Sequence, residues 1–333
     1  EKSKEEMIQS FKELIRQNKY VLAPMVICSI DGRNEIVEQC DLPFRMLVRK
    51  YKCNLCYTQM YHSRILFEDS KYLERSFHTC KEDRPLVIQG VLFFYVICSC
   101  VVMIPIAEGA AIQFAPYCDA VDLNLGCPQD SIVFFVIEGN RSKGSLWIFL
   151  LPDYDQIERI AKALGSPEVP IPFTVKIRLL PKMEDTLRLC KMLEREGAQL
   201  ITVIPHPLLM QIHGRTRDQN KEKVGACDWK AIKHIRETLS IPVFANGGIC
   251  TLSDVTRCLN ETGASGVMVG EAILENPALF VDGVDPVDGH LLSVVEKVPI
   301  SDIDEICLEY LELERAFPAL SSEIKAHMFK LLY

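Results

Sequence analysis

Three residues of the sequence combine reactive or charged side chains with positions that a fold can hold firmly. Cys127 stands between Gly126 and Pro128, so its thiol lies on a rigid turn, which suits a proton donor or a nucleophile better than core packing. Lys176 and Arg178 are two residues apart in an apolar segment, so they share one face of a strand there. Such a pair of cations suits an electron-rich ligand.

A second group of residues suits the binding of a phosphate and of a polar ring. Gly247, Gly248 and Gly270 carry no side chain, so their backbone amides can approach a phosphate closely. His213 can donate a hydrogen bond to a ring atom, and Gln89 can both donate and accept one. Taken singly, each has a commoner structural role, since a lone histidine or cysteine usually belongs to the core. Their chemistry therefore depends on the fold that brings them together.

These residues follow, or lie within, short apolar segments rich in β-forming residues. Eight such segments occur, at residues 21–25, 55–60, 85–89, 120–126, 173–180, 200–204, 242–248 and 266–270. Several intervening segments have helical periodicity, as at 185–196, 229–239 and 252–262. Eight strands that alternate with helices predict an α/β fold of the TIM (β/α)8 barrel type, whose active site lies at the carboxyl ends of the strands. The candidate residues would then meet at one mouth of the barrel, where a cation and phosphate-binding glycines suit a flavin nucleotide.

The same periodicity divides the chain of 333 residues into parts. Residues 1–20 predict an amphipathic N-terminal helix, residues 21–285 the barrel, and residues 290–333 a smaller all-helical C-terminal region. The apolar pattern of this last part stops abruptly at Tyr333, which favours a truncated domain. One large domain with a small one is a usual organisation for a chain of this length.

The composition is that of a globular protein with an acidic charge balance. Apolar residues make up 48% of the chain and charged residues 25%, enough to bury a substantial core. The formal net charge of −8 argues against a generic nucleic-acid-binding protein, because phosphate binding needs clustered Lys and Arg. Any contact with a nucleic acid must therefore come from a local basic surface.

The cysteines and one apolar segment indicate the cellular compartment, and whether the chain binds a metal or spans a membrane. The 14 cysteines are not spaced like a disulfide framework, and no signal peptide is recognisable, which predicts a cytoplasmic and also nuclear location. Cys53 and Cys56 have no second pair at zinc spacing, so we interpret them as structural thiols and expect no metal site. Residues 91–107 are 17 uncharged residues between two predicted strands, which favours a buried insert over a membrane span.

Beyond these features, the motifs at the predicted strand ends resemble the tRNA-dihydrouridine synthase family. Residues 121–129 (VDLNLGCPQ) are similar to its signature. Further similar motifs are 23–25 (APM), 41–45 (DLPFR), 56–62 (CYTQMYH), 84–89 (RPLVIQ), 176–178 (KIR), 213–216 (HGRT), 246–248 (NGG) and 269–280 (VGEAILENPALF). Tyr61, His62 and Glu271 most resemble the eukaryotic subfamily that acts at positions 16 and 17 of the tRNA D-loop.

The resemblance implies an FMN-dependent enzyme that reduces uridine to 5,6-dihydrouridine in tRNA, with NADPH or NADH as the reductant. Cys127 would donate the proton, Asn124 and Arg178 would contact the substrate, and the C-terminal helices would bind the tRNA. We expect a monomer without metal or membrane attachment. The residues implied to bind the cofactor are Ala23, Pro24, Met25, Gln89, Lys176, His213, Asn246, Gly247, Gly248, Gly270 and Glu271.

Four segments depart from the family pattern, at residues 26–40, 91–107, 130–150 and 204–212. Most of them are apolar and non-periodic, and we hypothesise that they reflect altered exon boundaries. Residues 91–107 would disturb a barrel helix, and residues 130–150 would alter the loop after Cys127. An alternative is therefore that the chain is a catalytically impaired relative that still binds flavin or tRNA.

Two other readings remain. A different FMN barrel, similar to a dihydroorotate dehydrogenase, would act on a free pyrimidine, but such a small substrate needs no helical C-terminal region. A purely structural barrel would leave the combination of Lys176, His213 and Asn246 without a role.

Overall fold

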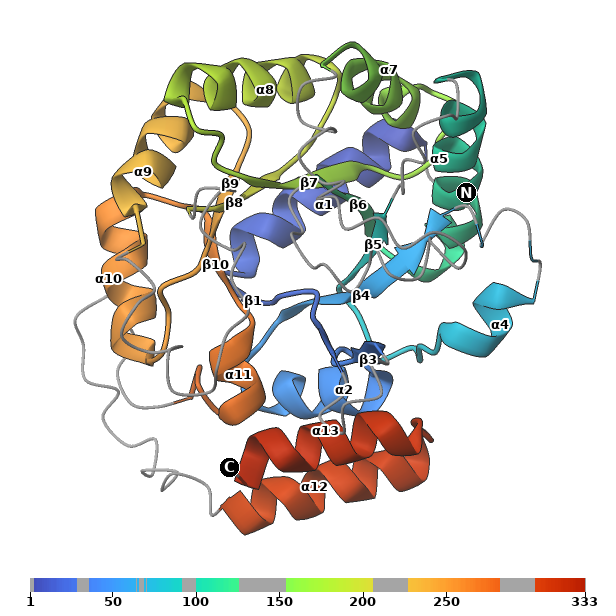
Figure 1. The fold of residues 1–333 in the computed structure, drawn as a ribbon, viewed down its shortest axis with the longest axis vertical. Coiled ribbons are helices and arrows are strands. Elements are labelled where there is room, and N and C mark those ends of the chain that lie inside the picture. Colours follow the sequence, from blue (N-terminus) through green and yellow to red (C-terminus); the bar gives the residue numbers. More distant parts are fainter. Residues whose placement is uncertain are drawn as a thin grey trace, which may run out of the picture.

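The computed structural model describes residues 3–28, 36–63, 65, 69, 71–91, 100–125, 154–205, 227–281 and 303–332. Within them, parallel strands close into a barrel whose neighbours run β1-β10-β9-β8-β7-β6-β5-β4 (Figure 1). The barrel strands are β1 (Tyr20–Leu22), β4 (Leu55–His62), β5 (Leu86–Val91), β6 (Ala120–Asn124), β7 (Phe173–Arg178), β8 (Ile201–Ile204), β9 (Val243–Asn246) and β10 (Gly266–Val269). Each predicted apolar segment overlaps one of these strands, so the predicted TIM barrel is confirmed.

Helices surround the barrel and cover the outer face of its strands (Figure 1). Each of the longer ones buries one stripe of apolar residues, as α8 does with Leu189 and Leu193. A capping box of Thr251 and Asp254 begins α10, and Gly263 ends it with a φ of 65° that few other residues adopt. The helices are α2 (Leu42–Lys50), α4 (Tyr72–Ser76), α5 (Cys100–Phe114), α7 (Tyr154–Gly165), α8 (Met183–Arg195), α9 (Trp229–Thr238), α10 (Leu252–Thr262) and α11 (Glu271–Glu275), with a 3₁₀ turn at Ala115–Tyr117.

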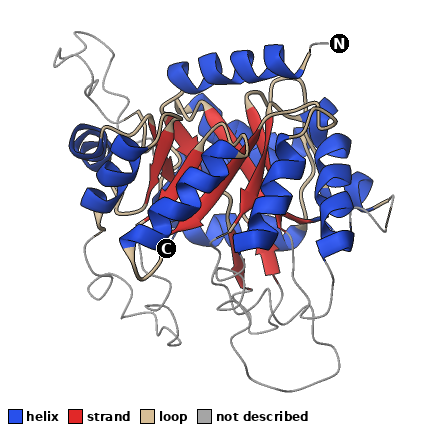
Figure 2. Ribbon diagram, turned by 90° about the horizontal axis from the view of Figure 1, so that it is seen from above, coloured by secondary structure: helices blue, strands red, loops and turns tan. Residues whose placement is uncertain are grey.

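Helix α1 (Lys4–Gln17) closes the amino-terminal end of the barrel. Its Phe11 and Ile15 are buried and belong to the same apolar cluster as Val21, Leu55 and Phe244, which stand on barrel strands. Figure 2 shows the helix lying across that end of the barrel. Among the described residues, the opposite end, where the strands finish, is not covered by α1.

The segment at residues 26–40 contains an antiparallel hairpin of β2 (Val26–Cys28) and β3 (Ile36–Glu38). This hairpin was not predicted, because its strands have three residues each and lack a long alternating pattern. The Gln39 amide donates a hydrogen bond to the Met25 carbonyl at 3.2 Å, which returns the chain to the end of β1.

The apolar run at residues 91–107 contributes to a barrel helix instead of disturbing one. Its last eight residues begin α5, in which Ile106 and Ala107 are buried and which packs against α7. The expectation of a disturbed helix after Gln89 is therefore wrong for the part of the run that the structure describes. None of the helices described is long and apolar enough to cross a membrane.

Two C-terminal helices, α12 (Ile303–Ala316) and α13 (Ser321–Leu332), pack beside α2 and α11 (Figure 1). His327 of α13 contacts Asp41, the N-cap of α2, with 2.7 Å between Nε2 and Oδ2, and its ring stacks on Phe44. The Tyr310 hydroxyl of α12 donates a hydrogen bond to the same carboxylate at 3.4 Å. Burial pushes the pKa of Asp41 up, but His327 and the capping hydrogen bond outweigh burial, so the pKa lies below its ordinary value.

Candidate functional site

The ends of β1 and β10 approach each other closely at the carboxyl-terminal mouth. The Ala23 amide donates to the Val269 carbonyl at 2.8 Å, directly after β1 ends. A side chain on Gly270 would bring a Cβ to within 3.1 Å of Met25 Sδ and 3.6 Å of Ala23 Cβ. The structure thus brings together the predicted cofactor-binding residues Ala23, Met25 and Gly270. Pro24 lies between the first two in the chain, and Gly270 has no side chain to cover its backbone.

The turn after β9 is fixed by backbone conformation. Gly247 and Gly248 have φ values of 122° and 72°, which residues with a side chain rarely adopt. A Cβ on Gly248 would also lie 2.8 Å from Cys227 Sγ. The Asn246 amide donates to the Met268 carbonyl at 2.8 Å and ties β9 to β10. Positions 247 and 248 therefore require glycine, whose backbone amides a ligand can approach.

A chain of hydrogen bonds crosses the barrel interior below the mouth. Thr174 Oγ1 donates to Asp122 Oδ1 at 2.5 Å, and Gln89 Nε2 donates to Asp122 Oδ2 at 2.6 Å. Asn124 Nδ2 then donates to Gln89 Oε1 at 3.0 Å and lies 3.0 Å from Met60 Sδ. The predicted cofactor residue Gln89 and the predicted substrate residue Asn124 are therefore in direct contact.

The two cations of β7 point into the same space. Thr174 reaches Asp122 inside the barrel, and Lys176 and Arg178 follow on the same face of the strand. Each is only 8% exposed, and Lys176 stands opposite Asn124 in the strand register. Burial raises the pKa of Asp122 to about 6, while its two hydrogen bonds and the nearby Lys176 act in the lowering direction. A cation and a carboxylate thus share the interior near the mouth.

Three other predicted site residues are not placed among these groups by the structure. Glu271 begins α11 and lies 3.8 Å from Lys330 Nζ of α13, so its carboxylate contacts the C-terminal helices. Cys127 and His213 lie outside the described residues. Their predicted roles as proton donor and flavin ligand rest on sequence alone.

Two residues that the sequence did not single out also belong to the site. Cys40 Sγ donates to the Ala23 carbonyl at 3.2 Å and accepts from the Met25 amide at 3.3 Å, so it holds the turn after β1. Nothing in the sequence marks this cysteine. Asp122 could have been found from the sequence, because an acidic residue between Val121 and Leu123 in a buried strand must have hydrogen-bond partners.

Cys53 and Cys56 are fully buried, as expected of structural thiols. The described residues contain no group of three or more His, Cys, Asp or Glu side chains arranged to hold a metal ion.

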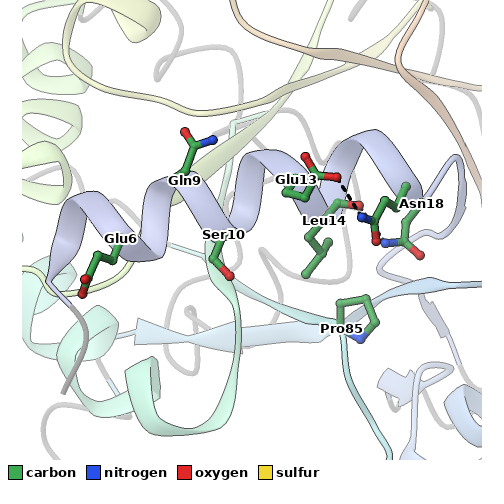
Figure 3. A pocket seen from close by; sticks show the side chains of 8 residues that line it. Glu6, Gln9, Ser10, Glu13, Leu14, Asn18 and Pro85 are labelled. Carbon is green, nitrogen blue, oxygen red and sulfur yellow. Dashed lines mark hydrogen bonds between the residues drawn. The ribbon is translucent and has the colours of Figure 1, made fainter.

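A surface depression elsewhere does not belong to the site. It lies along α1 and is lined by residues such as Glu6, Ser10 and Glu13, together with Pro85 just before β5 (Figure 3). Since α1 covers the amino-terminal end of the barrel, this depression is on the side away from the polar residues of the mouth.

Comparison with known proteins agrees with the class that the fold defines, a TIM barrel with a polar mouth. A solved 2-naphthoyl-CoA reductase complex has a similar fold, with a TM-score of 0.52 and 12% identity over 79% of this chain and 49% of that one. The family model described as dihydrouridine synthase (Dus) matches residues 36–313. The chain belongs to the dihydrouridine synthase family.

Several relatives show the same membership at higher similarity. A tRNA-dihydrouridine(16/17) synthase [NAD(P)(+)] of Schizosaccharomyces pombe is 36% identical, over 97% of this chain and 71% of its own length. A tRNA-dihydrouridine(16/17) synthase [NAD(P)(+)]-like protein of Rattus norvegicus is 35% identical over 94% of this chain. A tRNA-dihydrouridine(20a/20b) synthase [NAD(P)+]-like protein of Homo sapiens is 32% identical over 74% of this chain. The chain spans 59% of the length of the rat relative.

Proposed function

We propose that this chain carries the catalytic part of an FMN-dependent tRNA-dihydrouridine synthase of the 16/17 type, with NADPH or NADH as the reductant. The observation that carries the proposal is its similarity to 16/17 synthases over nearly its whole length, combined with the polar barrel mouth. The name of the Schizosaccharomyces pombe relative includes NAD(P)(+), which supports a nicotinamide reductant.

The residues of the mouth fit FMN. Gly247, Gly248 and Gly270 offer backbone amides for a phosphate at the ends of β9 and β10, the usual phosphate position in TIM barrels. Lys176 offers a cation and Gln89 an amide toward the ring. The remaining residues that we propose to hold FMN are Ala23, Pro24, Met25, His213, Asn246 and Glu271. Bound FMN, once reduced, would supply a hydride to C6 of uracil.

The chain's own residues would complete the reduction. Cys127 donates a proton to C5 as a general acid, so its thiol must be protonated when the C5–C6 double bond is lost. Asn124 and Arg178 position the uracil, whose nucleotide must leave its stack to enter the barrel. Among the described residues, α1 covers the amino-terminal end of the barrel, so the substrate would enter from the opposite end.

The tRNA itself would be bound by the C-terminal helices. We propose the division into an N-terminal helix at 1–20, a catalytic barrel at 21–285 and a helical tRNA-binding region at 290–333, in a monomer. With a net charge of −8, the tRNA-binding surface must be a local basic one. We also propose a cytoplasmic and nuclear location, in agreement with the lack of a recognisable signal peptide in this sequence.

The test is a reduction assay with an unmodified tRNA transcript, FMN and NADPH, in which dihydrouridine is located by mass spectrometry. We expect dihydrouridine at positions 16 and 17 and no reduction of free uracil or orotate. Reduction of a free pyrimidine alone would favour a different FMN barrel. Binding of FMN and tRNA without product would identify a catalytically impaired relative, the alternative that the atypical segment 130–150 after Cys127 suggests.

A further inference from the structure

Asp122 stands at the centre of the barrel's polar interior. The sequence motif that contains it predicted no role for this residue. It lies on β6 between the inward positions of Ala120 and Asn124, and it is 2% exposed. In the strand register it faces Gln89 of β5 on one side and Thr174 of β7 on the other.

The carboxylate fixes the direction of the Gln89 amide. An ionised carboxylate only accepts hydrogen bonds, so Gln89 must turn Nε2 toward it, at 2.6 Å from Oδ2. The Gln89 carbonyl oxygen then points the other way and accepts from Asn124 Nδ2 at 3.0 Å. One charge therefore sets the orientation of two amides that line the mouth.

This arrangement is costly for a residue that only fills space. Burial raises the pKa of Asp122 to about 6, so ionisation at neutral pH works against desolvation. Its direct partners, an amide and a hydroxyl, could be satisfied by a neutral side chain. The full charge that offsets this burial belongs to Lys176, which stands at the mouth. Groups with raised pKa values beside a cation in a concave interior are typical of functional sites.

We propose that Asp122 is a positioning residue of the flavin site, which orients the amides of Gln89 and Asn124 and places a negative charge beneath Lys176. This inference rests on the proposed function, since it assumes that the mouth binds FMN. Asp122 does not touch the reacting atoms; it acts through the residues above it.

The test compares FMN binding by the wild-type chain, Asp122→Asn and Thr202→Val. The asparagine has the size of the aspartate but no charge. It can accept from Gln89 Nε2 only as a weaker, neutral acceptor, and because its own amide can turn over, it no longer holds the Gln89 and Asn124 amides in one direction. Thr202 is the matched control, because it is a buried polar residue of the same barrel on strand β8, two strands away from β6, and its hydroxyl makes no hydrogen bond to Asp122, Gln89 or Asn124. Circular dichroism establishes that each variant is folded.

We expect Asp122→Asn to bind FMN at least about tenfold more weakly than the wild type, the effect of one hydrogen bond to a charged group, with Thr202→Val close to wild type. The visible absorption band of bound FMN should also shift with pH between 5 and 8 in the wild type and in Thr202→Val. Asp122→Asn should lack that shift, while titration of the FMN phosphate is common to all three proteins.

Equal affinity and an equal pH response in Asp122→Asn would overturn the inference and leave the proposed function standing. If Asp122→Asn does not fold, the pH dependence of the wild-type spectrum is the test. A flavin absorption band that does not move with pH would then refute the positioning role of Asp122. A wild-type chain that binds no FMN would refute the proposed function, and the inference with it.

Discussion

A buried carboxylate such as Asp122 makes the protein less stable at the pH where it functions. Its pKa of about 6 in the folded chain exceeds the ordinary value of 3.8, so the folded state binds a proton more tightly than the unfolded state. The contribution of this group to stability is therefore greatest in acid and falls as pH rises through about 6. Retaining such a cost is common at functional sites.

We predict that Asp122→Asn removes this component of the pH dependence. The free energy of unfolding of the variant, relative to wild type, should rise by about 2 kcal/mol between pH 4.5 and pH 7.5. Urea unfolding at the two pH values measures it. A difference between the two proteins that stays constant with pH would contradict the assigned pKa shift.

A second prediction concerns the proposed proton donor. Cys127→Ala should retain FMN but form dihydrouridine at least about 100-fold more slowly, because general acid catalysis by one side chain contributes that much or more. Single-turnover reduction of tRNA, followed by mass spectrometry, measures the rate. Cys80→Ala is the control, since this half-buried thiol lies in the loop before β5, away from the strand ends. Loss of FMN from Cys127→Ala would show that its role is wrong.

Residue chemistry could be predicted where a polar side chain interrupts an apolar strand. Gln89 and Lys176 were found in this way and Asn124 through the family resemblance, and the structure places all three in one interior. Asp122 was missed because the sequence shows which residues share a face of a strand but not which polar side chains form hydrogen bonds with one another. Cys40 could not be found, since its role depends on a turn that returns to β1 from another part of the chain.

At the scale of elements, the docking of α13 on α2 depends on a buried polar contact. His327 is fully buried, and its Nε2 lies 2.7 Å from the Asp41 carboxylate that caps α2. Glu323 on the same helix is also buried, and burial raises its pKa to about 7. Asp41 therefore depends on His327 to offset the cost of its own burial.

We predict that His327→Ala destabilises the chain by about 3 kcal/mol, because it leaves Asp41 buried without its main partner and removes the stacking on Phe44. Chemical unfolding measures the loss. Lys330→Ala, on the same helix, removes a partly exposed ion pair with Glu271 and should cost less than about 1 kcal/mol. Equal effects of the two substitutions would mean that the buried contact does not hold α13 in place.

Element prediction succeeded where patterns were long or strongly apolar. All eight barrel strands were found, and α10 coincides with its predicted segment of 252–262. The hairpin β2–β3 and the five-residue helices α4 and α11 were missed, because such short elements show no complete period. The apolar residues before Glu108 were misjudged, since periodicity cannot separate a buried helix from an insert.

At the scale of the whole molecule, the barrel changes in polarity from one end to the other. Its amino end is apolar, with Phe11 and Ile15 of α1 packed among strand residues. Its middle holds the hydrogen bonds of Asp122, and its carboxyl end has the glycine turns that require a bare backbone. A closed base, a charged middle and a bare backbone at the mouth are compatible with the flavin nucleotide that we propose.

The presence of FMN in that mouth can be measured directly on the purified chain. We predict a visible flavin absorbance spectrum, and a released cofactor that chromatography and mass spectrometry identify as FMN at about one per chain. A folded but colourless chain that takes up no added FMN would contradict the proposed function and leave a dihydrouridine synthase relative that has lost its cofactor.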